Sequence, residues 1–166
     1  MIKKTILLFI IITSILPYKQ NTVSNWKSLS LKDKIAQMVM VRVDGKYYHS
    51  DNNYKKKLKK WIGSYNVGGI ITFSGSIHGT FYNIKEFQNW SKTPLFVAAD
   101  YERGLGQWMD SATLFPSNMA VAATGNSNYA FKQGLVTSSE AKNIGVNIIL
   151  APVLDINNNP NNPIIN

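Results

Sequence analysis

The sequence predicts an α/β fold, namely the N-terminal half of a TIM-type (β/α)₈ barrel in which parallel strands alternate with helices. Three observations carry this prediction. Apolar segments typical of buried strands alternate along the chain with segments of helical period. Each predicted strand ends at a polar residue, as strands do at the ligand-binding face of a barrel. The 166 residues, less a targeting segment, make up about half of the roughly 250 that a complete barrel takes.

The first 20 residues predict a secretory signal peptide. Two lysines precede an apolar run at residues 6–16, and Pro17 ends that run. The run is shorter than the roughly 20 residues that span a membrane, so it fits an export signal better than a stable membrane span. We therefore expect an exported protein, periplasmic or extracellular, whose folded domain covers residues 26–166.

Composition argues against nucleic-acid, metal and thiol chemistry. The net charge of +9 is concentrated in the first 60 residues, which hold 13 of the 18 lysines and arginines. The remaining residues lack the basic stripe that a folded nucleic-acid-binding face needs. There is no cysteine, and His49 and His78 lie far apart without a ligand spacing. No metal, cofactor or nucleic-acid partner is expected.

The lysine-rich segment shows the clearest helical period. Apolar residues recur at i, i+4, i+7 and i+8 from Tyr54, opposite a run of lysines, which predicts a helix over 54–65. The lysines form either a solvated helix face or a weak contact for an anionic surface. A capping box at Ser30 and a stop at Gly145 mark the ends of other helices. These further helices are expected over 31–37, 82–91 and 128–143.

Four strands are expected between these helices, over residues 38–43, 68–73, 94–100 and 146–153. Their carboxyl ends carry, in order, Asp44, Ser74, Asp100 and Asp155. Parallel strands of a barrel present their carboxyl ends at one face, and that face binds the ligand. We therefore expect these four polar side chains on the ligand-binding face.

The segment Asp100–Gly106 is the most informative part of the chain. Residues i and i+2 of a strand share a face, so Asp100 and Glu102 project into the same space. The glycines that follow then break the strand. Two carboxylates at the end of a barrel strand are placed to hold the polar groups of a ligand. A strand that ends in a solvated acidic turn fits the same pattern.

Five segments, in this order, resemble the N-terminal domain of glycoside hydrolase family 3. They are residues 29–38 (opening helix), 67–73 (second strand), 96–104 (third strand with its D-x-E-x-G loop), 115–120, and 145–157 with the following N-P-x-x-P. The resemblance covers residues 26–166, as a partial (β/α)₈ barrel domain. It is closest to the β-N-acetylhexosaminidase branch.

The resemblance implies a retaining hydrolase that removes terminal β-linked N-acetylhexosamine, such as N-acetylglucosamine, from carbohydrates of cell-wall or chitin origin. Asp100 matches the aspartate that binds the sugar hydroxyls, and Glu102 matches an acidic position that orders the loop. Trp108 stands where the family carries a sugar-binding arginine, so Arg103 is the candidate replacement and the third substrate-binding residue. Trp108 either stacks on a sugar ring or packs against the protein.

No catalytic residue is assigned within the 166 residues. The resemblance places the nucleophilic aspartate, a Lys-His motif and a His-containing acid/base loop in segments that would follow Asn166. We therefore expect an N-terminal fragment that lacks the nucleophile and does not hydrolyse substrate by itself. A β-glucosidase of the same family, and a non-catalytic sugar-binding remnant or decayed fragment, are the alternatives.

Overall fold

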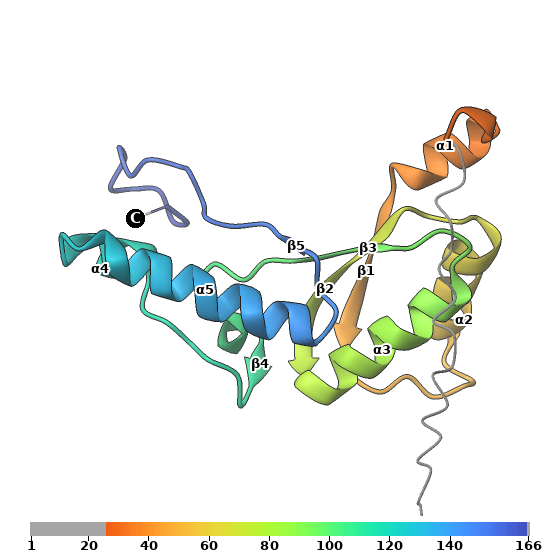
Figure 1. Ribbon diagram of the computed structural model, residues 1–166, viewed down its shortest axis with the longest axis horizontal. Helices are drawn as coiled ribbons and strands as arrows, with labels where there is room; N and C mark the ends of the chain where they lie inside the picture. The colour runs from red at the N-terminus through yellow and green to blue at the C-terminus, as the bar shows by residue number, and fades with distance from the viewer. Residues whose placement is uncertain (1–25, 166) are drawn as a thin grey trace, which may run out of the picture.

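The computed structural model describes residues 26–165, which form an open parallel β-sheet with helices packed against it (Figure 1). The strand order is β1-β2-β3-β5, and each neighbouring pair is parallel. These strands span Met40–Gly45 (β1), Gly69–Ser76 (β2), Phe96–Ala99 (β3) and Ile148–Ile149 (β5). The predicted class, with parallel strands adjacent in chain order, is confirmed. The predicted signal peptide, residues 1–20, lies outside the described residues.

Helices occupy the connections between the strands, as a βα repeat requires. They are α1 (Leu31–Gln37), α2 (Asn53–Lys59) with its π-helical continuation η2 (Lys60–Ser64), α3 (Ile77–Trp90), α4 (Asn118–Ala123) and α5 (Ser127–Asn143). Two 3₁₀ turns and a two-residue strand complete the elements: η1 (Trp26–Ser28), η3 (Leu105–Gln107) and β4 (Met109–Asp110). Over residues 26–165, no helix is both long and apolar enough to cross a membrane.

One hydrophobic core fills the space between the sheet and its helices. Alternate strand residues point into it, and Val43, Ile70 and Val97 are at most 1% exposed. The helices contribute Leu58, Ile62, Ile84, Phe87 and Ala141 to the same cluster. The other face of the sheet, here called the inner face, is open, since Met40 is 40% and Phe96 59% exposed. A residue's parity along its strand therefore decides whether it joins the core or the inner face.

Two predicted helix ends have the expected hydrogen bonds. Ser30 Oγ accepts from the Asp33 backbone N–H (3.1 Å) and donates to the Asp33 carboxylate (2.6 Å). At the end of α5, Gly145 has φ of +92° and its N–H donates to Lys142 O, while the next N–H donates to Ala141 O. This is a Schellman motif, and its left-handed residue is most favourable as glycine.

The lysine-rich helix turns its cations to solvent. Leu58 and Ile62 are fully buried, whereas the lysines at 56, 57, 59 and 60 are exposed. Lys55 differs, because its Nζ lies 3.0 Å from Glu86 Oε2 on α3. The exposed lysines fit both a solvated helix face and a contact for an anionic surface. The segment is an α-helix followed by a π-helical turn instead of one continuous α-helix.

The fourth predicted strand is much shorter than its apolar run. We expected residues 146–153, but β5 covers Ile148–Ile149. The last bond of this ladder runs from the Leu150 N–H to Ala99 O at 2.9 Å. Pro152, two residues further on, has no N–H to donate. The ladder therefore stops, and the chain beyond it is irregular.

Three further elements differ from the sequence prediction. α3 begins at Ile77, five residues before the predicted start at residue 82, because Ser76 Oγ caps it by accepting from the Gly79 N–H (2.9 Å). The section between β3 and α5, for which no element was predicted, contains the short helix α4. It also contains β4, which pairs in parallel with the end of β2.

Candidate functional site

Asp44, Phe73 and Asp100 lie next to one another at the carboxyl ends of β1, β2 and β3. The residues that precede them are partners in the register of the sheet, and β2 carries one extra residue opposite Asp44. Neighbouring strands lie about 4.8 Å apart, so Asp44 and Asp100 flank Phe73 at a separation of about 10 Å. In a parallel α/β sheet this edge is where ligands bind.

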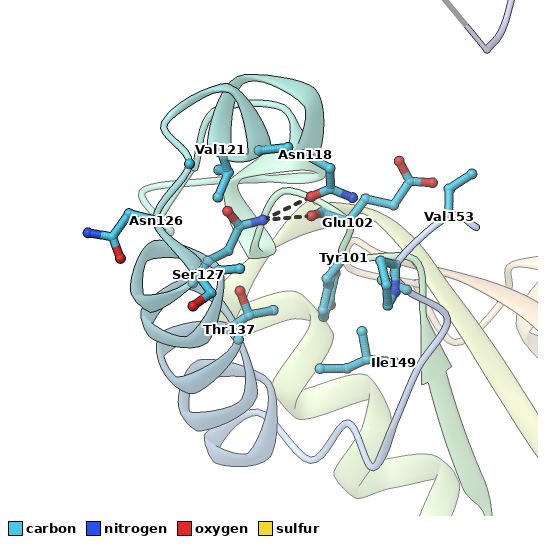
Figure 2. Close-up of a pocket in the computed structure, with 16 residues that line it drawn as sticks. Tyr101, Glu102, Asn118, Val121, Asn126, Ser127, Thr137, Ile149 and Val153 are labelled. Atoms are coloured by element: carbon cyan, nitrogen blue, oxygen red, sulfur yellow. Dashed lines mark hydrogen bonds between the residues drawn. The ribbon is translucent and has the colours of Figure 1, made fainter. Parts of the chain in front are cut away.

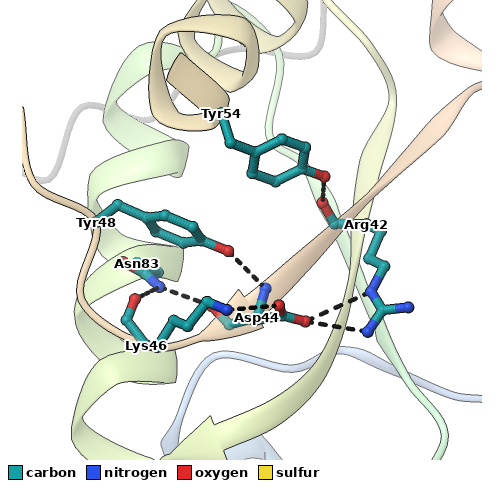
Figure 3. A network of polar contacts seen from close by, with 6 residues as sticks. All are labelled: Arg42, Asp44, Lys46, Tyr48, Tyr54 and Asn83. Carbon is teal, nitrogen blue, oxygen red and sulfur yellow. Dashed lines mark hydrogen bonds and ion pairs between the residues drawn. The ribbon is translucent and has the colours of Figure 1, made fainter. Parts of the chain in front are cut away.

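A network of polar contacts holds the end of β1 (Figure 3). The two carboxylate oxygens of Asp44 face different cations, Arg42 Nη2 at 3.4 Å and Lys46 Nζ at 3.4 Å. The Asp44 N–H donates to Tyr48 Oη (2.9 Å), and Tyr54 Oη donates to Arg42 O (2.7 Å). Burial raises the pKa of both tyrosines, so both stay neutral hydroxyls at physiological pH. The backbone at this strand end is therefore fixed from both sides.

Asp100 and Glu102 share a space, as their spacing predicts. Burial raises the pKa of Glu102, and the charge of Asp100 and a hydrogen bond between the two carboxyl groups raise it further. The loop itself is held by the main chain of Glu102, whose carbonyl accepts from Gln133 Nε2 at 3.0 Å (Figure 2). Its carboxyl group is left facing Asp100. The contact from Glu102 to α5 is made by its carbonyl oxygen and not by its acidic side chain.

Trp108 packs against Phe73 and bonds to the backbone of Asp100, at the start of the loop after β3. The indole Nε1–H donates to Asp100 O at 2.7 Å. The indole ring meets Phe73 edge-on, with centroids 5.6 Å apart. Of the two interpretations of Trp108, these contacts favour packing. The bond also fixes the backbone of Asp100, and so the direction in which its carboxylate leaves the strand.

Arg103 is bound on the far side of the same loop. Its Nε donates to Phe115 O (3.2 Å), and its own carbonyl accepts from the Phe115 N–H (2.8 Å). Among residues 26–165, no hydrogen bond or ion pair joins its side chain to Asp100 or Glu102. The next residue, Gly104, has φ of +83°, and a Cβ there would lie 2.5 Å from Thr113 O. The tight turn after the acidic pair therefore requires glycine.

A cavity of about 740 Å³ opens beside this loop (Figure 2). It lies between α4, α5, the loop after β3 and the segment around Pro152, and most of its lining is apolar. Three buried polar atoms on its wall have no hydrogen-bond partner within the described part of the chain: Tyr101 Oη, Gln133 Oε1 and Thr137 Oγ1. Glu102 also lines this cavity whereas Asp100 does not, so the cavity adjoins the acidic pair on the side away from Asp100.

Other predicted side chains stay outside the site. Ser74 lies in β2 and is exposed, and Asp155 is exposed, six residues beyond the end of β5. His49 and His78 are also exposed. In the described range, no three His, Cys, Asp or Glu side chains gather where they could hold a metal ion.

Sequence reasoning missed two inner-face side chains, Arg42 and Phe73. The Arg42 guanidinium carbon lies 4.6 Å from the centroid of the Phe73 ring. Strand parity could have found Arg42, because it stands two residues before Asp44 and shares its face. Its position over Phe73 depends on the register between β1 and β2, which composition does not show.

Comparison with known proteins assigns the chain to a family. The family model for the glycosyl hydrolase family 3 N-terminal domain matches residues 30–166. The chain belongs to this family. The family 3 chain is 34% identical, over 123 residues, to β-hexosaminidase A of Pseudoalteromonas piscicida, covering 66% of the chain and 21% of that protein. It is 33% identical, over 119 residues, to a β-N-acetylglucosaminidase/β-glucosidase of Cellulomonas fimi, covering 72% and 21%.

Among solved structures, the family 3 chain is similar to β-glucoside phosphorylase BglX bound to 2FGlc. The TM-score is 0.72 at 28% identity, and the match covers 83% of the chain and 24% of that structure. The chain thus spans about a fifth of the length of the curated relatives it matches. The family and the fold expected from the motifs are both confirmed.

Proposed function

We propose that this chain is the sugar-binding N-terminal part of a retaining glycosidase that releases terminal β-linked N-acetylhexosamine, chiefly N-acetylglucosamine, from the non-reducing end of a carbohydrate. The observation that carries the proposal is the position of Asp100. It is a half-buried carboxylate at the carboxyl end of β3, on the inner face. A carboxylate there accepts two charge-assisted hydrogen bonds from neighbouring hydroxyls, which fixes the orientation of one sugar.

Glu102 and Arg103 have supporting parts in this proposal. Glu102 lies against Asp100 and extends the acidic surface that accepts hydrogen bonds from the sugar. Arg103 is tied to Phe115, so its contribution to sugar binding is to hold the loop that carries the acidic pair. None of the three is proposed as the nucleophile.

The 166 residues alone are proposed to bind sugar without hydrolysing it. A retaining glycosidase needs a nucleophilic carboxylate and a separate acid/base group on either side of the scissile bond. We assign neither function to a residue of this chain. We also propose that residues 1–20 direct export as a signal peptide and that residues 26–166 form part of the barrel domain, acting in the periplasm or outside the cell on cell-wall or chitin-derived sugars.

A β-glucosidase is the second candidate. The Cellulomonas fimi relative is named for both activities, and the similar solved structure is named for a β-glucoside. Asp100 would accept hydrogen bonds from the hydroxyls of glucose as it would from those of N-acetylglucosamine, because the two sugars differ only in the substituent at one carbon.

Hydrolysis of two aryl glycosides by the complete protein that carries these residues separates the candidates. We expect kcat/KM for the aryl β-N-acetylglucosaminide to exceed that for the aryl β-glucoside by at least about tenfold, the discrimination that one lost polar contact gives. The reverse ratio would establish the β-glucosidase. Turnover of neither substrate by folded protein would contradict both candidates.

A further inference from the structure

We propose that Arg42 is the hydrogen-bond donor of the sugar site, holding from β1 the same sugar that Asp100 holds from β3. This inference rests on the proposed function, because it names a second contact of the same ligand. Sugar hydroxyls both donate and accept hydrogen bonds, and ionised carboxylates only accept. A site built on acidic groups therefore needs a donor on another strand to satisfy the ligand oxygens.

Arg42 is mounted rigidly at the correct end of the sheet. Its residue lies within β1, in register with Ile71 of β2. Its carbonyl oxygen accepts from Tyr54 Oη at 2.7 Å. The carbonyl oxygen of Asp44, two residues after Arg42, accepts a hydrogen bond from Asn83 Nδ2 at 3.0 Å. Binding groups on braced strands hold their geometry better than groups on free loops.

The Arg42 guanidinium is held in place by protein contacts and still has N–H donors that bind no protein atom in the described part of the chain. It lies over the Phe73 ring at 4.6 Å, the geometry of a cation–π contact. Its Nε and Nη2 both reach one oxygen of Asp44, at 3.4 Å, which is long for a charge-assisted bond. A guanidinium has five N–H donors, so three remain without a protein partner in the described part of the chain. The side chain is 63% exposed, and a ligand can therefore reach these donors.

A continuous surface joins Arg42 to Asp100. Phe73 lies under the guanidinium and meets Trp108 edge-on at 5.6 Å, and the Trp108 indole is bonded to the backbone of Asp100. Apolar C–H faces of a sugar ring pack well on aromatic groups. We therefore place the sugar beside Phe73, with donors from Arg42 on one side and acceptors from Asp100 on the other.

Lys46 provides the matched control. It is the other cation on Asp44, at the same distance of 3.4 Å and with a similarly exposed side chain, 65%. It lies beyond the strand end, and no aromatic ring within residues 26–165 contacts its ammonium group. If the cations served only to balance the charge of Asp44, Arg42 and Lys46 would be equivalent.

The experiment measures N-acetylglucosamine binding to the full 166-residue chain, by saturation-transfer NMR at low micromolar protein. The variants are Arg42→Met, Arg42→Lys, Lys46→Met and Asp100→Asn, each checked by urea unfolding. We expect Arg42→Met and Asp100→Asn each to raise Kd about tenfold or more, as loss of a charge-assisted bond does. Lys46→Met should stay within about twofold of wild type. Arg42→Lys should lie between wild type and Arg42→Met, because a lysine keeps the charge without the planar fork.

The outcomes separate the two proposals. Unchanged binding in folded Arg42→Met or Arg42→Lys, with weakened binding in Asp100→Asn, would overturn the role of Arg42 and leave the proposed function standing. Equal losses in Arg42→Met and Lys46→Met would also overturn it, since general charge would explain both. Absence of binding in folded wild type would contradict the proposed function, and the role of Arg42 with it.

Discussion

Glu102 holds its proton more tightly than an ordinary glutamate does. Burial raises its pKa, and the neighbouring Asp100 carboxylate raises it further. Protonation of Glu102 removes the repulsion between the two carboxylates and leaves the Asp100 oxygens free to accept from a ligand. The ionised Glu102 places a second negative charge beside the first. The raised pKa therefore links the protonation of this pair to both stability and ligand binding.

Glu102→Gln is expected to remove a pH-dependent part of the stability. For a carboxyl group with a raised folded-state pKa, the stabilisation is fully present below the unfolded value, ordinarily 4.5, and is lost as pH rises through the folded-state pKa. Wild type should therefore lose free energy of unfolding relative to Glu102→Gln as pH increases from 4 through that range. Urea unfolding of both proteins at a series of pH values measures this difference. A constant difference, or one that favours wild type as pH rises, would contradict the raised pKa.

At the scale of elements, one glycine lies within α5 and another follows its end, and their conformational requirements are opposite. Gly134 lies within the helix, and a Cβ there would meet nothing within 4 Å. Gly145 ends the helix with φ of +92°, and a Cβ there would approach Ile84 Cγ2 at 3.0 Å. The first glycine costs the helix conformational entropy, whereas the second is required by the turn.

Alanine at these two positions should change stability in opposite directions. Gly134→Ala should raise the free energy of unfolding by about 0.5–1 kcal/mol. Gly145→Ala should lower it by about 1–3 kcal/mol, the cost of a left-handed non-glycine residue. Chemical denaturation of both variants against wild type tests this, each serving as the control for the other. A stabilising Gly145→Ala would show that the Schellman motif does not form.

The elements also show which parts of the fold sequence reasoning can reach. β1, β2 and β3 were predictable because each is a continuous apolar run in a chain of alternating periods. β5 was overestimated, since its length depends on where β3 stops and on the missing N–H of Pro152. β4 has only two residues and forms through its pairing with β2, so no local pattern marks it. α4, with six residues, is too short for a clear helical period.

Some residues of the candidate site were also predictable from the sequence, and others were not. Asp100 and Glu102 were predictable as neighbours because residues two apart share one strand face. Arg42 and Phe73 could not be placed together, since their contact crosses two strands and depends on register. The sequence suggested Arg103 as a ligand-binding residue, but its side chain bonds to Phe115. These two residues are 12 apart in the sequence, so no local pattern indicates the contact.

At the scale of the whole molecule, the inner face of the sheet is a large exposed apolar surface. Met40, Phe96 and Leu150 all project from it and are 40–59% exposed. Exposed patches of this kind, next to open strand edges, promote association between chains. The open face therefore affects solubility as well as ligand binding.

We expect the 166-residue chain to self-associate and to release no aryl group from aryl β-N-acetylglucosaminides above the buffer rate. Light scattering against concentration should show association, and Phe96→Ser should reduce it because the change removes apolar area from the inner face. Tyr47→Ser is the control, since Tyr47 is 82% exposed but lies in the loop between β1 and α2. A monomeric preparation that hydrolyses these substrates would show that catalytic groups lie within the chain.

Asp100→Asn tests most directly whether this strand end holds the sugar. The measurement is kcat/KM for a terminal N-acetylglucosaminide, in the complete protein that carries these residues, with exposed Asp155→Asn as the control. Charge-assisted hydrogen bonds contribute about 1.5–3 kcal/mol each, so we expect Asp100→Asn to lower kcat/KM by roughly tenfold to more than a hundredfold per bond. The variant should still fold, because the bond from the Trp108 indole N–H goes to the Asp100 carbonyl oxygen and does not involve the carboxylate. A kcat/KM near wild type in soluble Asp100→Asn protein would contradict the assignment of this carboxylate to the sugar.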